Sequence, residues 1–180
     1  MTGPADDDTL HAAWLAGDDA AFDSLVERHG RAVLGFLRTL VGGQAEDVWS
    51  ESWLRVLRAR HRYEPSGHYR AWLFTIARRC AQDHQRGARR WFRLRAAAEF
   101  EVPPPPPPNP ERHLRLVQQK GQVSDALATL SAQQQAIVRL TYAEGLSSAV
   151  IGEILGLSDQ QVRNKLTYAR RLLRERLQEE

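Results

Sequence analysis

Six consecutive prolines at positions 103–108, followed by Asn109 and Pro110, interrupt the chain beyond its midpoint. Proline has no backbone N–H and a fixed φ, so a series of prolines favours extended polyproline II and cannot continue a helix. At about 3.1 Å per residue the run spans roughly 19 Å and acts as a semi-rigid spacer. A ligand for an aromatic-lined peptide-binding domain is the alternative reading. The run therefore predicts a linker at residues 98–114 between one unit at 1–97 and another at 115–180.

The charge of the chain is small in total but unevenly placed. The formal net charge is +3, and hydrophobic residues make up 42% of the chain, which is adequate for a packed core. Acidic residues gather near the N-terminus, at 6–8 and 18–19, and the only lysines are Lys120 and Lys165. Nearly all positive charge is therefore arginine, whose planar guanidinium suits phosphate and guanine edges.

Several classes of protein are disfavoured by what the sequence lacks. Cys80 is the sole cysteine, which excludes an intrachain disulfide framework and a multi-cysteine zinc site, and we expect it in the core. No apolar run approaches the ~20 residues that cross a bilayer. The start, MTGPADDD, lacks the basic and apolar segments of a signal peptide. We expect a soluble cytoplasmic protein with no membrane insertion and no cofactor.

The first unit reads as an all-α bundle. Apolar residues recur at three- and four-residue steps over 10–15, 20–41 and 44–60, and no stretch shows strand alternation. The segment Tyr63–His68, YEPSGH, contains a proline and a glycine and is predicted to be a loop. A further helix follows from Tyr69. We expect Trp49 and Trp53 to be core residues rather than a ligand platform.

The stretch from Tyr69 to Arg95 changes character along its length. Its first half carries one apolar helix face, made of Tyr69, Trp72, Leu73, Ile76, Ala77 and Cys80. Its second half sets seven arginines and two aromatic residues against Asp83 alone: Arg78, Arg79, Arg86, Arg89, Arg90, Arg93 and Arg95, with Trp91 and Phe92. A solvated helix face is the alternative, but such a face usually alternates the sign of its charges. The pattern favours a polyanion with bases that can stack.

The second unit contains a predicted helix-turn-helix. Ser131–Gln134 and Ser158–Gln161 fit capping boxes, and Ser147 is placed to cap a short helix between them. The last helix buries an apolar stripe and presents polar and basic residues outside it, namely Gln160, Gln161, Arg163, Asn164, Lys165, Tyr168 and Arg171. Gln, Asn and Arg can each make paired hydrogen bonds to base edges in a major groove. The unit is predicted to bind DNA, with a plain packing unit as the alternative.

Taken together, these segments resemble the extracytoplasmic-function (ECF) group of bacterial RNA polymerase sigma factors, in the sigma-70 family. The resemblance runs from Trp14 to Leu177 and rests on four segments in the family's order. WLAGDDAAFDSLVERHGRAVLGFL is similar to the opening helices, QAEDVWSESWLRVLRAR to the helix that docks on the polymerase clamp, YRAWLFTIARRCAQDHQR to the minus-ten segment, and ALATLSAQQQAIVRLTYAEGLSSAVIGEILGLSDQQVRNKLTYARRLLRERL to the minus-thirty-five domain. Ser50 and Arg79 depart from the glutamine and asparagine that are common there.

The resemblance implies a sigma factor, which is not an enzyme, with domain 2 at 1–97 and domain 4 at 115–180. Its partners would be core RNA polymerase, promoter DNA and an anti-sigma factor. The minus-ten and melting residues would be Tyr63, Ser66, His68, Arg78, Arg79, Arg86, Arg89 and Arg90. The minus-thirty-five residues would be Ser158, Gln160, Gln161, Arg163, Asn164, Lys165, Tyr168 and Arg171, and the polymerase-binding residues Asp47, Ser50, Glu51 and Arg55.

Two other classes of function are kept as alternatives. The chain could be a transcriptional regulator that binds DNA without joining polymerase, with the first unit as a sensor or dimerisation module. It could also be an enzyme with a metal held by His68, Asp83 and His84. The metal site is disfavoured because Asp83 and His84 are adjacent and project about 100° apart on a helix.

Overall fold

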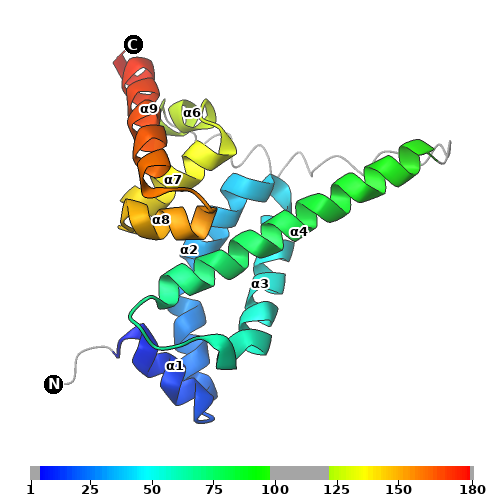
Figure 1. Ribbon diagram of the computed structural model, residues 1–180, viewed down its shortest axis with the longest axis vertical. Coiled ribbons are helices and arrows are strands. Elements are labelled where there is room, and N and C mark those ends of the chain that lie inside the picture. Colours follow the sequence, from blue (N-terminus) through cyan, green and yellow to red (C-terminus); the bar gives the residue numbers. More distant parts are fainter. Residues whose placement is uncertain (1–4, 98–121, 179–180) are drawn as a thin grey trace.

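The computed structural model of the chain describes residues 5–97 and 122–178, and within these ranges it contains helices and turns but no strand. The predicted all-α fold is confirmed. The predicted linker at 98–114 lies outside the described residues. The first group of helices comprises α1 (Asp7–Leu15), α2 (Asp19–Val41), the 3-10 turn η1 (Gly42–Gln44), α3 (Ala45–Ala59), the 3-10 turn η2 (Arg60–Arg62) and α4 (Tyr69–Ala97). The second comprises α6 (Gln122–Ala128), α7 (Ala132–Tyr142), α8 (Ser148–Leu155) and α9 (Asp159–Gln178), as Figure 1 shows.

Local signals set the helix ends in the first group. The side chain of Asp6 accepts a hydrogen bond from the backbone N–H of Thr9 at 2.7 Å, so α1 begins earlier than the predicted start at Leu10. Asp18 caps α2 in the same way, through the N–H of Ala20. Helix α2 ends at Val41, and its C-cap is Gly42, whose φ of +56° favours glycine. The predicted helices at 20–41 and 44–60 are confirmed, each within a residue of its predicted bounds.

The core of the first group lies where α4 packs between α2 and α3. Leu73 and Phe74 are fully buried, and the rings of Phe74 and Phe36 meet edge-on with their centroids 5.3 Å apart. Cys80 is buried as predicted, and burial raises the pKa of its thiol. Trp53 is buried, and the indole N–H of Trp49 donates to the carbonyl of Gly30 at 2.9 Å. Both tryptophans are therefore structural, as expected.

An aromatic cluster joins α1 to the start of α4. The ring of His11 is fully buried and is surrounded by the rings of Trp14, Tyr63, Tyr69 and Trp72, with centroid distances of 4.9 to 6.1 Å. Burial lowers the pKa of His11, which keeps the ring neutral in this apolar setting. The cluster fixes α1 beside the segment that precedes α4.

The second group has the predicted helix-turn-helix. Ser131 and Gln134 form a reciprocal capping box at the start of α7, and Ser158 and Gln161 form another at the start of α9. The hydroxyl of Ser147 caps α8 by accepting from the N–H of Val150. The turn between α8 and α9 passes through Gly156, whose φ is +65°. These elements pack around Ile137, Leu140, Ile154, Val162 and Ala169.

The two groups pack against each other, with α7 against α2 and α8 against α4. The guanidinium of Arg139 on α7 lies directly over Gly35 of α2, where a Cβ would come within 2.0 Å of Arg139 Nη2. Arg70 at the start of α4 donates to Glu144, which follows α7, at 2.8 Å. Glycine at position 35 therefore leaves room for the guanidinium of Arg139 against α2.

Candidate nucleic-acid and polymerase interface

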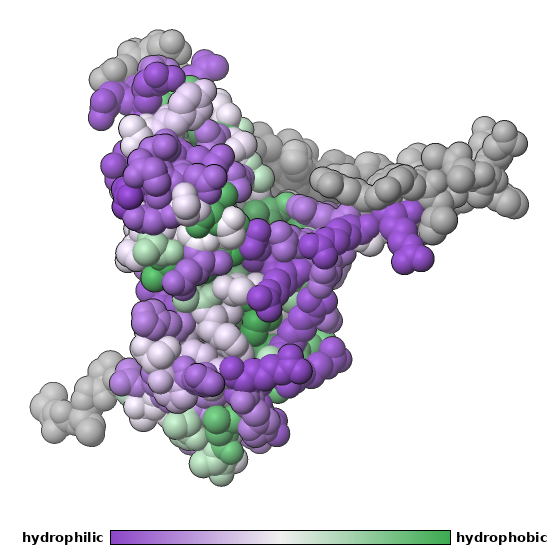
Figure 2. Space-filling model, in the orientation of Figure 1, coloured by the Kyte–Doolittle hydropathy of each residue, from purple (hydrophilic) through white to green (hydrophobic). Residues whose placement is uncertain are grey.

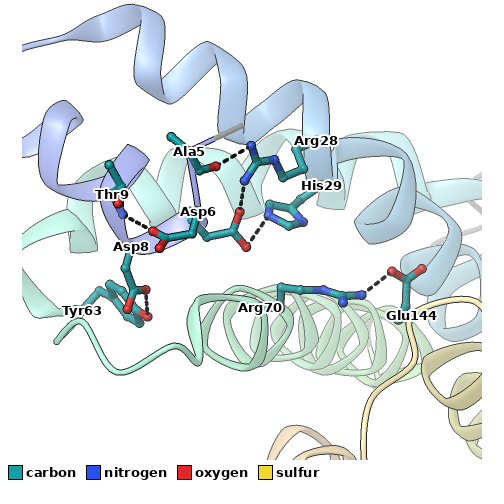
Figure 3. Close-up of polar contacts among 10 residues, drawn as sticks. Ala5, Asp6, Asp8, Thr9, Arg28, His29, Tyr63, Arg70 and Glu144 are labelled. Atoms are coloured by element: carbon teal, nitrogen blue, oxygen red, sulfur yellow. Dashed lines mark hydrogen bonds and ion pairs between the residues drawn. The ribbon is translucent and has the colours of Figure 1, made fainter. Parts of the chain in front are cut away.

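The loop Tyr63–His68 stands at the entrance to α4 and is tied to α1. Ser66 and His68 are exposed, whereas Tyr63 is buried with 6% exposure. The hydroxyl of Tyr63 donates to Asp8 Oδ1 at 2.5 Å (Figure 3), and the backbone N–H of Gly67 donates to Asp8 Oδ2 at 2.7 Å. Burial and then the hydrogen bond to Asp8 raise the pKa of Tyr63 to about 12, so its hydroxyl remains a donor at neutral pH.

This geometry separates the three loop residues that were predicted to contact DNA. Ser66 and His68 face solvent and can contact a ligand, while the ring of Tyr63 supports the loop from below. Sequence reasoning missed Asp8, which appears in the sequence only as one member of an acidic run. No local signal distinguishes it, because its partners lie 55 and 59 residues away.

Helix α4 carries the predicted arginines beyond the loop. Arg79, Arg86 and Arg90 are exposed, and the side chain of Arg89 lies outside what the structure describes. Asp83 lies among them, 3.6 Å from Arg86, in an exposed pair. Charges in such a pair are well solvated and cost little to separate. Hydrophilic side chains cover the outward part of α4 in the space-filling view (Figure 2).

Arg78 differs from the other arginines of α4 because it is covered by the second group of helices. It is half-buried, and a Cβ placed on Gly156 would lie 3.3 Å from Arg78 Nη2. Burial, and to a lesser extent the charge of Arg79, lowers the pKa of Arg78. The turn of the helix-turn-helix therefore sits on a residue that was predicted to contact DNA.

The outward face of α3 holds the residues that were predicted to bind polymerase. Asp47 and Ser50 are exposed and Glu51 is half-buried. Leu54 lies on the same face, one turn beyond Ser50, and is 46% exposed. Sequence reasoning missed Leu54. The available signal was a single apolar residue at helical spacing within an otherwise polar face, a pattern that is common on protein surfaces and does not by itself mark an interface.

Arg55 is placed differently from its neighbours on α3. It donates to Glu51 at 3.0 Å and to Asp83 of α4 at 2.6 Å, and these two hydrogen bonds, that of Asp83 first, raise its pKa. Arg55 therefore braces α3 against α4. Its guanidinium is engaged within the chain rather than presented freely to a partner.

The polar face of α9 is open to solvent. Gln160, Gln161, Arg163, Asn164, Tyr168 and Arg171 are exposed, as is the cap residue Ser158, while Lys165 is half-buried. Several of these side chains are organised along the helix: Gln160 donates to Asn164 at 2.9 Å, Arg163 pairs with Asp159, and the guanidinium of Arg171 lies over the ring of Tyr168. The structure brings all eight predicted residues together on one helix and its cap.

An open cleft of about 420 Å³ lies where α1, α2, α4 and the end of α7 meet. Its charged groups are paired with one another: Asp7 lies 2.7 Å from Arg28 and 2.9 Å from His29, and Arg70 is bound to Glu144 (Figure 3). Burial lowers the pKa of His29, and the hydrogen bond that its ring donates to Asp7 opposes this. The cleft is thus a polar junction between elements.

Within residues 5–97 and 122–178 the structure shows neither a membrane-spanning helix nor a metal-binding cluster. No helix there is long and apolar enough to cross a bilayer. No group of three His, Cys, Asp or Glu side chains within 5–97 and 122–178 is arranged to hold a metal ion, and this includes His68, Asp83 and His84.

Comparison with known families identifies both halves of the chain. Residues 25–91 match Sigma-70 region 2, and residues 120–173 match Sigma-70, region 4. The ECF RNA polymerase sigma factor SigL of Mycobacterium tuberculosis is 34% identical over 170 residues, covering 91% of this chain and 93% of SigL. The sigma factor CarQ of Myxococcus xanthus is also 34% identical over 170 residues, covering 91% of this chain and 92% of CarQ.

Solved structures agree with this assignment. CnrH in complex with the cytosolic domain of CnrY aligns with a TM-score of 0.66 at 25% identity, over 95% of this chain and 96% of that one. RpoE of Bartonella quintana, in complex with the anti-sigma factor NepR, shares the fold with a TM-score of 0.65 at 23% identity, over 87% of this chain and 96% of that one.

Members of this family are transcription initiation factors and not enzymes. The chain has both DNA-recognition regions of the family in the family's order. It belongs to the ECF group of the sigma-70 family, and it directs promoter-specific transcription initiation with core RNA polymerase.

Proposed function

We propose that three surfaces divide the work of initiation. The loop Tyr63–His68 and the exposed side of α4 bind and open the minus-ten element, the polar face of α9 binds the minus-thirty-five element, and the outward face of α3 binds core polymerase. The observation that carries this proposal is the position of Arg79, Arg86 and Arg90, exposed along a helix whose first residues adjoin Ser66 and His68. The domain limits that match this division are 1–97 for domain 2, 98–114 for the linker and 115–180 for domain 4.

At the minus-ten element the two parts of the surface have different tasks. Arginines along α4 hold the phosphate backbone through charge-assisted hydrogen bonds, which fixes the duplex but does not read sequence. The exposed polar groups of Ser66 and His68 contact a base that has left the stack, because an unpaired base must be captured before the duplex can stay open. This assignment leaves Tyr63 as the support of the loop.

The contribution of Arg86 can be measured through its salt dependence. Replacing Arg86 with alanine removes one phosphate contact, so promoter affinity of the holoenzyme falls and the slope of log K against log salt decreases by about one unit. Arg31→Ala, an exposed arginine on α2, is the control and leaves the slope unchanged. Equal slopes for Arg86→Ala and the unmodified protein would show that α4 does not lie along the backbone there.

The sequence preference of the minus-thirty-five contact is tested at Asn164. Asparagine binds adenine through two hydrogen bonds, so Asn164→Ala relaxes the preference at one base pair by about 1–3 kcal/mol and leaves the other positions unchanged. Arg174→Ala, an exposed residue farther along α9, changes affinity equally for all promoters. Binding of a set of single-base promoter variants checks this, and an unaltered preference profile would exclude α9 as the reading helix.

The polymerase-binding face is tested at Leu54. An exposed leucine among Asp47, Ser50 and Glu51 is suited to be the apolar centre of an interface with a polar rim. Leu54→Ala therefore weakens the affinity for core polymerase about tenfold. Leu15→Ala removes a side chain with similar exposure, 38%, from the end of α1 rather than from α3, and leaves the affinity unchanged. Equal affinities for the two variants would contradict the assignment of this face.

We also propose that the chain works in the cytoplasm, where the polymerase is, and that an anti-sigma protein holds it inactive. The similar structures of CnrH and RpoE support this, since CnrH was solved with the cytosolic domain of CnrY and RpoE with the anti-sigma factor NepR. Purifying the native protein from uninduced cells provides the test: a stoichiometric protein partner that blocks binding to core polymerase is expected. Recovery of free, active protein would contradict the proposal.

A further inference from the structure

We propose that Asp8 is a positioning residue for promoter opening, because its carboxylate holds the loop Tyr63–His68 in the shape that receives the unpaired base. The inference rests on the proposed role of this loop at the minus-ten element. Asp8 itself does not contact DNA in this account. It acts through the two loop residues to which it is bound, Tyr63 (Figure 3) and Gly67.

The two oxygens of Asp8 serve opposite ends of the loop. Oδ1 accepts from the hydroxyl of Tyr63, the first residue of the loop, and Oδ2 accepts from the backbone N–H of Gly67, next to its last residue. Glu64, Pro65 and Ser66 lie between these two anchors and are exposed. One carboxylate therefore closes the loop into a ring, which fixes where its exposed residues point.

Ser66 also lies within hydrogen-bonding reach of the Tyr63 hydroxyl, and its own contact with His68 is weak. The ring of His68 lies 3.4 Å from the hydroxyl of Ser66, at the outer limit of a hydrogen bond, and both side chains are exposed. The carbonyl of His68 accepts from the N–H of Trp72 at 3.2 Å, which belongs to the start of α4 rather than to the loop tip. The bonds to Asp8 are shorter and charge-assisted, and such bonds are about twice as strong as neutral ones.

The backbone at Gly67 is shaped for this contact. Its φ of +73° lies in the left-handed region that other residues avoid, and a Cβ at this position would meet nothing within 4 Å. Glycine is thus required here by the turn and not by crowding. The turn brings the N–H of Gly67 to the carboxylate.

Asp8 can act as a fixed point because α1 is held by other residues. Asp6 caps the helix, Asp7 pairs with Arg28 and His29 of α2, and Trp14 is buried in the core. Changing Asp8 therefore leaves the attachment of α1 in place. The three successive aspartates at 6–8 share no partner with one another.

The test uses holoenzyme assembled from the full chain and core polymerase, with promoter DNA that carries 2-aminopurine at successive positions of the minus-ten non-template strand. A base that leaves the stack gives a rise in fluorescence at its position. Asn at position 8 removes the negative charge from both hydrogen bonds and reverses the one with Tyr63, because its amide nitrogen donates and the hydroxyl must then accept. In holoenzyme with Asp8→Asn, the fluorescence rise at the position of the captured base is about tenfold slower. The preference for the correct base at that position falls by a similar factor.

Asp6→Asn is the matched control. It removes the same charge two residues away, and asparagine is as good a helix cap as aspartate. We expect Asp6→Asn holoenzyme to behave as the unmodified one, and affinity for core polymerase and the preference at the minus-thirty-five element to be unchanged in both variants. If Asp8→Asn gives the same rates and discrimination as Asp6→Asn, the proposal is wrong.

Tyr63→Phe provides a second variant that keeps the buried ring and removes one of the two hydrogen bonds. It is expected to reduce the signal at the same position by several-fold, and an unchanged signal would overturn the proposal even if Asp8→Asn proved unstable. An unmodified holoenzyme that initiates transcription but shows no fluorescence rise at any minus-ten position refutes base capture itself, so the failure of the proposed function is distinguished from that of Asp8.

Discussion

The burial of the first half of α4 is the constraint on which the rest of the structure depends. Leu73, Phe74 and Ala77 are fully buried against α2 and α3, and the same helix continues without a break to Ala97. A continuous helix of 29 residues is about 43 Å long. Its packed end therefore fixes both the loop that precedes it and the direction of the arginines that follow. Substituting a large core side chain here costs about 2–5 kcal/mol, a large share of the stability of a small domain.

Arg55 cross-links α3, with its proposed polymerase-binding face, to α4, the helix proposed to bind DNA. Its two hydrogen bonds join Glu51 on α3 to Asp83 on α4. A partner that binds the outward face of α3 therefore also fixes the orientation of α4, because Arg55 adds a polar cross-link between the two helices above the apolar core. The same arrangement explains why Asp83 is the one acid among the arginines of this stretch: it neutralises Arg55 from the neighbouring helix.

Features set by local chemistry were predictable from the sequence. The three-to-four spacing of apolar residues gave the helices and the burial of Cys80, and the serine–glutamine pairs gave the capping boxes of α7 and α9. Features that depend on contacts between residues far apart in the sequence were not predictable. Asp8 and Tyr63 are far apart in sequence, and only the packing of α1 beneath the loop brings them together. Short helix α6 was missed because its seven residues are too few for a periodic pattern.

The packing of the two groups makes the proposed DNA contacts unequally accessible. The polar face of α9 is exposed, whereas the guanidinium of Arg78 lies beneath Gly156. A phosphate and the Gly156 turn therefore compete for the same side chain, so α8 must leave α4 before Arg78 can reach the DNA backbone. The ion pair of Arg70 with Glu144, whose side chains are 35% and 10% exposed, is part of what holds the groups together, beside the packing of α7 on α2 and of α8 on α4.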